Sequence, residues 1–177
     1  MTQTSPDEIQ IVPMDDLVKL KVVTGDIYSE EWSYEIRGDL SYLKAEQITW
    51  RGTNKLLFIC VPSNKAKNKK RQPVLMTLSE LPEREKIIAS AKMLILIVDG
   101  KSIPLSPRIV KEAPKLSGDL YIEWAILLTP KLIAALKFAD RLGSGISPGP
   151  PEEFAGVAGV HLGNGRQKLS TFLDNCL

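Results

Sequence analysis

Two cysteines and one histidine are the side chains of this 177-residue chain that are best suited to covalent chemistry. Cys60 lies in an apolar run typical of a strand, and Cys176 lies on the apolar face of an expected final helix, so both are expected near one core. They could form a disulfide, worth about 4 to 5 kcal/mol for so long a loop. They could equally be two free thiols packed as small hydrophobic groups. Their number and spacing exclude a CxxC redox pair and a closed zinc site.

The single histidine, His161, would have to serve any Ser/His or Cys/His mechanism. A Cys60–His161 dyad is one interpretation, but no residue near Cys60 in sequence indicates a stabilised thiolate. Carboxylate pairs such as Glu152-Glu153 stand beside expected turns, and adjacent side chains point different ways on a strand, so they do not form a catalytic dyad. We therefore expect a protein that is not an enzyme, with no metal and no cofactor.

Two basic features are candidates for anion binding. The first is the segment 65–71, which places five positive charges in seven residues: Lys65, Lys67, Lys69, Lys70 and Arg71. The formal net charge is +2, and without these five the remaining 18 cations against 21 anions would give −3. Attraction for a polyanion would therefore have to act through this segment. It contains no aromatic residue for base stacking, so a solvated hairpin tip is the alternative interpretation.

The second basic feature is Arg166 with Lys168, which follows Gly163-Asn-Gly165 and precedes the expected last helix. Glycines ahead of a helix can turn backbone N–H groups toward an anion, to which the two cations would add charge. The segment lacks the GK[ST] ending of a P-loop, and an ordinary Asn-Gly turn explains it equally well.

Composition favours one folded domain. Apolar residues make up 44% and charged residues 25%, as in soluble globular proteins. We expect a polar, flexible arm over residues 1–8 and a single globular domain over 9–177. No apolar run is long enough to cross a bilayer. The N-terminus lacks the features of a signal peptide, so the chain is either cytoplasmic or a mature form.

Short alternating runs predict many strands in the first half, at Leu17–Thr24, Trp32–Arg37, Gln47–Arg51, Leu56–Val61 and Pro73–Leu78. Ser79–Lys86 is expected to form one helical turn at most, capped by Ser79. The run Ile87–Val98 then leads into Asp99-Gly100, a dipeptide that favours a tight hairpin with Lys101–Leu105. Pro104 indicates a short or edge strand there.

The second half predicts a loop through Pro107, Pro114 and Gly118, then a half-buried strand at Leu120–Leu128. Thr129 and Pro130 are typical of a helix start, and the apolar spacing continues to Leu142 before Gly143. A loop over 143–151 and a strand at Phe154–Leu162 should follow. A last helix buries Leu169, Phe172, Leu173 and Cys176. The fold class is therefore α+β: a mainly antiparallel β sandwich or barrel-like sheet with two short C-terminal helices.

Residues 50 to 177 resemble a loose group of small bacterial extracytoplasmic β-rich proteins, which includes type VI secretion-associated periplasmic proteins and invasion-associated locus B-like proteins. The shared elements are Trp50, the strand ending Leu57-Phe-Ile-Cys60, the run Ile97-Val-Asp-Gly100, the helix Leu132–Leu142 after a strand, and a last helix finishing Leu173-Asp-Asn-Cys176. Paired first and last cysteines in that group imply a Cys60–Cys176 bond here. The resemblance brings no catalytic residues with it.

The resemblance implies a non-enzymatic binding or accessory module of the bacterial cell envelope, either periplasmic or secreted. Its expected partner is another protein. The second hypothesis is a cytoplasmic protein that binds nucleic acid or another polyanion through segment 65–71, with Arg166 and Lys168. The two differ in compartment and in the surface used.

Overall fold

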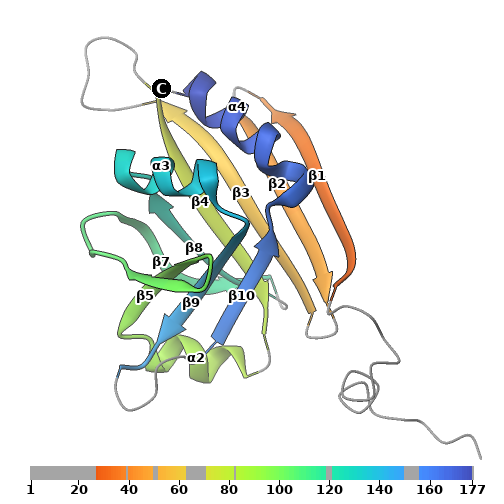
Figure 1. The fold of residues 1–177 in the computed structure, drawn as a ribbon. Helices are drawn as coiled ribbons and strands as arrows, with labels where there is room; N and C mark the ends of the chain where they lie inside the picture. The colour runs from red at the N-terminus through yellow and green to blue at the C-terminus, as the bar shows by residue number, and fades with distance from the viewer. Residues whose placement is uncertain are drawn as a thin grey trace, which may run out of the picture.

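The computed structural model describes residues 27–38, 40–49, 52–62, 71–81, 83–118, 121–149 and 156–176. Within these ranges the strands form two antiparallel sheets, and neither sheet closes into a barrel (Figure 1). Sheet A has the order β1 (Ile27–Arg37), β2 (Leu40–Thr49), β3 (Gly52–Pro62), β4 (Arg71–Glu80), β8 (Tyr121–Leu127) and β7 (Val110–Ser117). Sheet B has the order β10 (Gly156–His161), β9 (Arg141–Ser147), β5 (Met93–Val98) and β6 (Lys101–Pro104).

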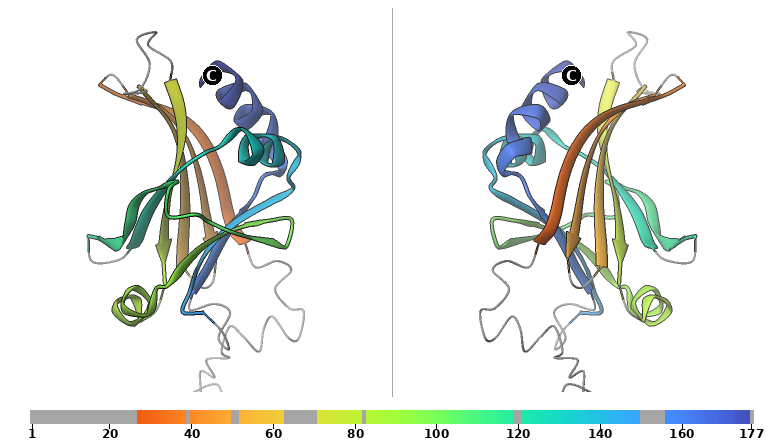
Figure 2. Two further views of the ribbon diagram at one scale, coloured as in Figure 1. Left: turned by 90° about the vertical axis from the view of Figure 1, so that its left-hand side faces the viewer. Right: turned by 90° about the vertical axis from the view of Figure 1, so that its right-hand side faces the viewer.

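Three α-helices belong to the described part of the chain: α2 (Arg84–Ser90), α3 (Pro130–Phe138) and α4 (Arg166–Cys176), the last preceded by a 3-10 turn at Gly163–Gly165. Sheet B, α3 and α4 lie on one face of sheet A, and α2 lies near one end of the two sheets (Figure 2). The expected α+β architecture is confirmed, with two of its helices near the C-terminus. None of these helices has the length and apolar character needed to cross a bilayer.

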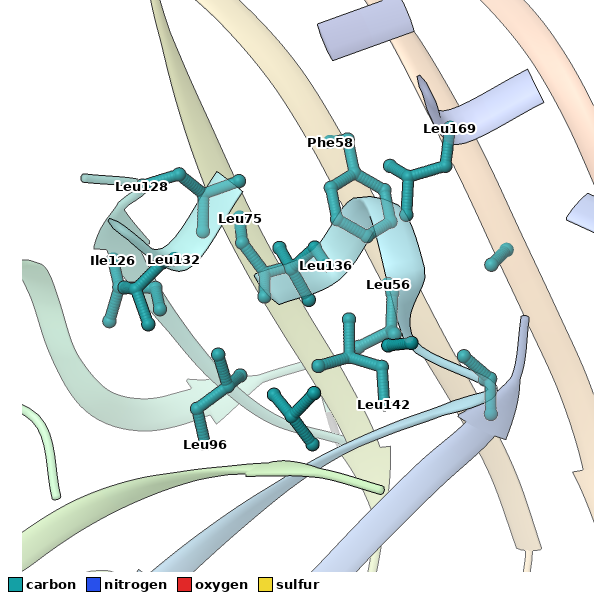
Figure 3. Packing of buried hydrophobic residues seen from close by; sticks show 14 of the residues in the cluster. Leu56, Phe58, Leu75, Leu96, Ile126, Leu128, Leu132, Leu136, Leu142 and Leu169 are labelled. Atoms are coloured by element: carbon teal, nitrogen blue, oxygen red, sulfur yellow. The ribbon is translucent and has the colours of Figure 1, made fainter. Parts of the chain in front are cut away.

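The inner face of sheet A supplies much of the core. Leu43, Phe58, Leu75 and Ile126 occupy one row across β2, β3, β4 and β8, and each is fully buried. Side chains from α3, α4 and sheet B fill the space above this row (Figure 3). Alternation along β3 explains the arrangement, because every second residue of that strand is buried and the residues between are half-exposed.

Several strands begin where we predicted other structure. The strand expected at Gln47–Arg51 exists but begins earlier than predicted, because β2 starts at Leu40 and runs to Thr49; the next strand starts at Gly52. The segment expected as a loop through Pro107, Pro114 and Gly118 contains edge strand β7, in which Pro114 is tolerated beside two register shifts. The expected loop over 143–151 is also corrected, since β9 runs to Ser147 between β5 and β10.

The helices have shifted boundaries as well. Helix α2 spans seven residues rather than one turn at most, and it begins after Glu83, while the expected cap Ser79 lies inside β4. It also occupies part of the run expected as the strand Ile87–Val98. Helix α3 begins as predicted, with the Thr129 side chain accepting a hydrogen bond from the Leu132 amide. It ends at Phe138 rather than at Gly143.

The hairpin prediction is confirmed. Asp99 and Gly100 both have positive φ angles, of 49° and 77°, and they join β5 to β6. Pro104 ends β6 at the edge of sheet B. The Asp99 carboxylate also accepts hydrogen bonds from the amides of Asp140 and Arg141, both at 2.8 Å, so the turn holds the start of β9. The arm 1–8, the strand Leu17–Thr24 and the residues Lys65 to Lys70 lie outside the described residues.

Candidate functional site

The two cysteines meet across the core. Their Sγ atoms are 2.13 Å apart, a disulfide distance, with the Cα atoms separated by 5.6 Å and the residues by 116 positions in sequence. Both residues are buried, Cys60 on the inner face of β3 and Cys176 at the end of α4. In this state Cys60 has no thiol to offer to a Cys60–His161 pair. His161 is partly exposed at the end of β10, where it pairs with Arg141 in the ladder.

Of the cations that we considered for anion binding, the structure describes Arg71, Arg166 and Lys168, and it does not bring Arg71 together with the other two. Arg71 is the first residue of β4, and two residues later Pro73 pairs with Cys60. Because Cys60 contacts Cys176, Arg71 lies near the C-terminal end of α4. Arg166 and Lys168 lie at the other end of that helix, about 15 Å along its axis. Arg166 pairs with Asp140 and donates to the Ala139 carbonyl, and Lys168 donates to the Trp32 carbonyl at 3.0 Å. Both side chains therefore serve to dock α4 on its neighbours.

A surface that the sequence did not reveal lies on the outer face of sheet A. Aliphatic side chains of β3, β4 and β8 line up there in register, with Leu57 beside Met76 and Ala125, and with Ile59 beside Val74 and Leu127. We call this set the aliphatic stripe; it consists of Leu57, Ile59, Val61, Val74, Met76, Leu78, Ala125 and Leu127. Val74 and Ala125 are buried, with exposed fractions of 7% and 2%, and the other six side chains are half-buried. In both side views α3 and α4 lie on the opposite side of the sheet, and α2 lies beside the lower end of the sheet on the side away from them (Figure 2).

A row of polar side chains borders the stripe. Lys44 contacts the carboxylates of Glu35 at 3.1 Å and Glu46 at 3.5 Å, and Lys55 contacts Glu46 at 3.5 Å. The Lys55 ammonium also lies 5.2 Å from the centre of the Tyr121 ring, a cation–π distance. With Tyr42, these residues form what we call the polar belt, which crosses sheet A from β1 to β8: Glu35, Tyr42, Lys44, Glu46, Lys55 and Tyr121. Its two acids and two bases balance, so it carries no excess charge.

Electrostatics are most strongly perturbed at the β1 end of the belt. The Tyr42 hydroxyl donates to Glu35 Oε2 at 2.5 Å and Ser33 donates to Oε1 at 3.2 Å. The Tyr42 hydrogen bond, followed by that of Lys44, lowers the pKa of Glu35 from its ordinary 4.5 to about 2. The same contact with Glu35 raises the pKa of the Lys44 ammonium. Glu35 and Lys44 therefore form an ionised pair at neutral pH.

Replacing Tyr42 with Phe should raise the pKa of Glu35 toward 4.5, because the largest cause of its depression is removed. A depressed carboxyl pKa stabilises the fold above the unfolded-state value, and this stabilisation is lost as the pH falls through the folded-state value. The free energy of unfolding of wild type should thus exceed that of Y42F at neutral pH, and this difference should disappear as the pH falls from about 4.5 to about 2. Carboxyl chemical shifts of Glu35, followed by NMR against pH, measure the change. An unchanged midpoint in Y42F would show that Tyr42 does not hold the carboxylate.

No protein-family model, curated protein or solved structure matches this chain. The site is therefore interpreted from its own chemistry. In the described part of the chain, no three His, Cys, Asp or Glu residues are grouped so that they could hold a metal ion. A hollow of about 580 Å³ beside β5, β6 and β7 is lined mainly by apolar residues such as Met93, Leu105 and Val110. Among its described lining residues, Lys92 is the charged one.

The stripe and the belt together have the anatomy of a protein-binding surface: an apolar centre with a polar border. The face is a sheet surface rather than a cavity, which suits a macromolecular partner better than a small ligand. Sequence reasoning missed it because the stripe combines β3 and β4 with β8, which lies much later in the chain. The alternation Leu57, Ile59, Val61 was visible, but alternation alone does not tell which face of a strand is covered.

Proposed function

We propose that the protein is a non-enzymatic binding or accessory module of the bacterial cell envelope, periplasmic or secreted. It binds a folded protein partner through the outer face of sheet A. The aliphatic stripe carries this proposal, because six-stranded sheets usually cover an apolar face with another layer. A folded protein with an apolar patch of similar width would supply the missing layer.

The partner's chemistry follows from the belt. Glu35, Glu46, Lys44 and Lys55 are already paired with one another, so this border neither attracts polyanions nor repels a neutral surface. The polyanion hypothesis has less support among the described residues, because Arg166 and Lys168 have intramolecular partners. The envelope location is supported by the disulfide distance between Cys60 and Cys176, since such bonds persist mainly in oxidising compartments.

A photo-crosslinking residue at Met76, in the middle of the stripe, tests the binding surface in the native cell. We expect a discrete protein adduct from position 76 and none from the control position Lys131, which is exposed on α3 on the opposite side of sheet A. Capture at both positions, or at neither, would argue against the outer face as a docking surface.

A second step makes the result quantitative. With the crosslinked partner purified, Ile59→Lys should weaken binding by about 30-fold, the effect of losing one interface hot spot. Lys131→Ala is the matched control and should leave the affinity unchanged. Circular dichroism of both variants excludes loss of folding. Binding that survives I59K would contradict the proposal.

The location is tested separately by cell fractionation followed by intact mass measurement. We expect the protein in the periplasmic or secreted fraction, and its mass should rise by that of two hydrogen atoms on reduction. Cytoplasmic protein with free thiols would reject the envelope assignment and leave the docking surface to be judged by the crosslinks.

A further inference from the structure

The hollow beside β5, β6 and β7, with a volume of about 580 Å³, lies where the chain passes from sheet B to sheet A. Strand β6 is the last strand of sheet B and β7 is the last strand of sheet A, and both lie on the side of the fold away from β1 (Figure 1). The described lining residues come from 91–94 at the start of β5, from the connection 105–109 and from β7. Sites for small molecules commonly have such a volume and a mainly apolar lining.

Backbone hydrogen bonds hold the walls of this hollow in place. The Leu105 amide donates to the Leu94 carbonyl at 2.9 Å, which ties the connection 105–109 to β5. At the other end of the connection the Ile109 amide donates to the Ser106 carbonyl at 3.0 Å, and the Ile109 carbonyl accepts from the Leu127 amide at 2.7 Å. Leu94 and Leu105 are also buried in the core, so they form a fixed apolar floor. A ligand would therefore meet a pre-formed surface and would not have to order a loop.

The charges around the hollow are mostly positive. Lys92 lines it and is exposed, and Arg108, Lys111 and Lys115 are exposed cations that each adjoin a lining residue in sequence. The one carboxylate among the residues that line the hollow or adjoin a lining residue in this way is Glu112, which contacts the Lys115 ammonium at 2.7 Å. Four cations against one anion give a charge of +3 beside an apolar surface. A local excess of positive charge attracts anions to such a site.

We infer that the hollow binds a small amphipathic anion, namely a single apolar chain that ends in a carboxylate. The apolar chain contacts Met93, Leu105 and Val110, and the carboxylate stays at the mouth, where Lys92 and the neighbouring cations balance its charge. An inorganic anion would leave the apolar floor uncovered, and a neutral apolar molecule would gain nothing from the positive charges. This inference does not depend on the proposed function, since none of the described lining residues belongs to the aliphatic stripe.

NMR of the full chain labelled with ¹³C in its methionine methyl groups tests the site. We expect decanoate, kept below the concentration at which it forms micelles, to shift the Met93 methyl signal and to leave that of Met76, on the aliphatic stripe, unchanged. Octanoate should bind about fifteenfold more weakly, because it buries two fewer methylene groups at about 0.8 kcal/mol each. Decyltrimethylammonium has a chain of the same length and the opposite charge, so it should bind about tenfold more weakly than decanoate.

Two variants with matched controls test the position of the carboxylate. Ala113→Glu adds a negative charge at an exposed lining position and should weaken decanoate binding at least tenfold, whereas Ser102→Glu, exposed on β6 outside the lining, should have no effect. Lys92→Gln should weaken decanoate binding about threefold, as expected for the loss of one exposed ion pair, and Lys101→Gln should leave it unchanged. All four residues are exposed, so the variants should fold, and circular dichroism checks this.

Three results would overturn the inference. A Met93 signal that decanoate does not move would show that the hollow takes no such ligand. Equal shifts of Met93 and Met76 would show that the apolar chain binds without selecting the hollow. Equal affinities for decanoate and decyltrimethylammonium, or an A113E variant that binds decanoate as wild type does, would contradict an anionic ligand. Each of these results leaves the crosslinks from position 76 unaffected, so the docking surface on sheet A is judged separately.

Discussion

Reducing the Cys60–Cys176 pair is expected to lower the free energy of unfolding by about 4 to 5 kcal/mol. The physical reason is the length of the closed loop: the two residues are 116 positions apart, so the crosslink removes a large amount of conformational entropy from the unfolded chain. A loss of this size is comparable with the whole stability of many domains. Urea unfolding of wild type with and without reductant measures it.

The double variant Cys60→Ala with Cys176→Ala provides the control. Alanine is preferred to serine because both positions are buried, where a hydroxyl without a partner would add its own cost. The variant should have the stability of reduced wild type and should not respond to reductant. If wild type is equally stable with and without reductant, the two sulfurs are not bonded in the purified protein.

Replacing Gly165 with Ala is expected to destabilise the fold by about 3 kcal/mol. A Cβ atom at this position would lie 1.9 Å from Cε2 of the Trp32 indole, far inside any contact distance. Trp32 is buried and its ring is rigid, so the start of α4 would have to shift away from β1. Insertion of a methyl group into a packed core costs about this much. Denaturant midpoints, compared at equal slope, measure the loss.

Gly163→Ala is the matched control, because nothing lies within 4 Å of a Cβ at that position. It should change stability by less than about 0.5 kcal/mol. Trp32→Leu gives a second check: in that background G165A should cost much less, since the clashing ring is gone. If G165A lowers the free energy of unfolding equally in both backgrounds, a clash with the Trp32 indole is not the cause of the loss.

Local signals in the sequence were sufficient for some elements. The Thr129-Pro130 start, the Asp99-Gly100 turn and the apolar spacing of Leu169, Phe172 and Leu173 each describe a structure formed within a few residues. The alternation of β8 likewise indicated a half-buried strand. These elements were predicted because their cause is local.

Elements that depend on pairing were not predicted. Strand β9 contains Gly143, Ser144 and Gly145, which suggest a loop, yet it forms the middle of sheet B because β5 and β10 supply hydrogen bonds on both sides. The first half of β2 was missed because its outer positions, such as Tyr42 and Lys44, are polar. The candidate site could not be predicted for a related reason: its belt joins residues from Glu35 to Tyr121, whose proximity is set by the order of strands in sheet A.

The close approach of Gly165 to Trp32 also gives the protein a built-in optical signal. Trp32 is covered by the start of α4, whereas Trp124 is buried on the inner face of β8. Release of α4 alone would expose the Trp32 indole to water and shift its fluorescence emission to longer wavelength. Full unfolding would shift both. Replacement of the other two tryptophans, Trp50 and Trp124, by phenylalanine would therefore leave Trp32 as the reporter and allow the detachment of one helix to be followed by its emission.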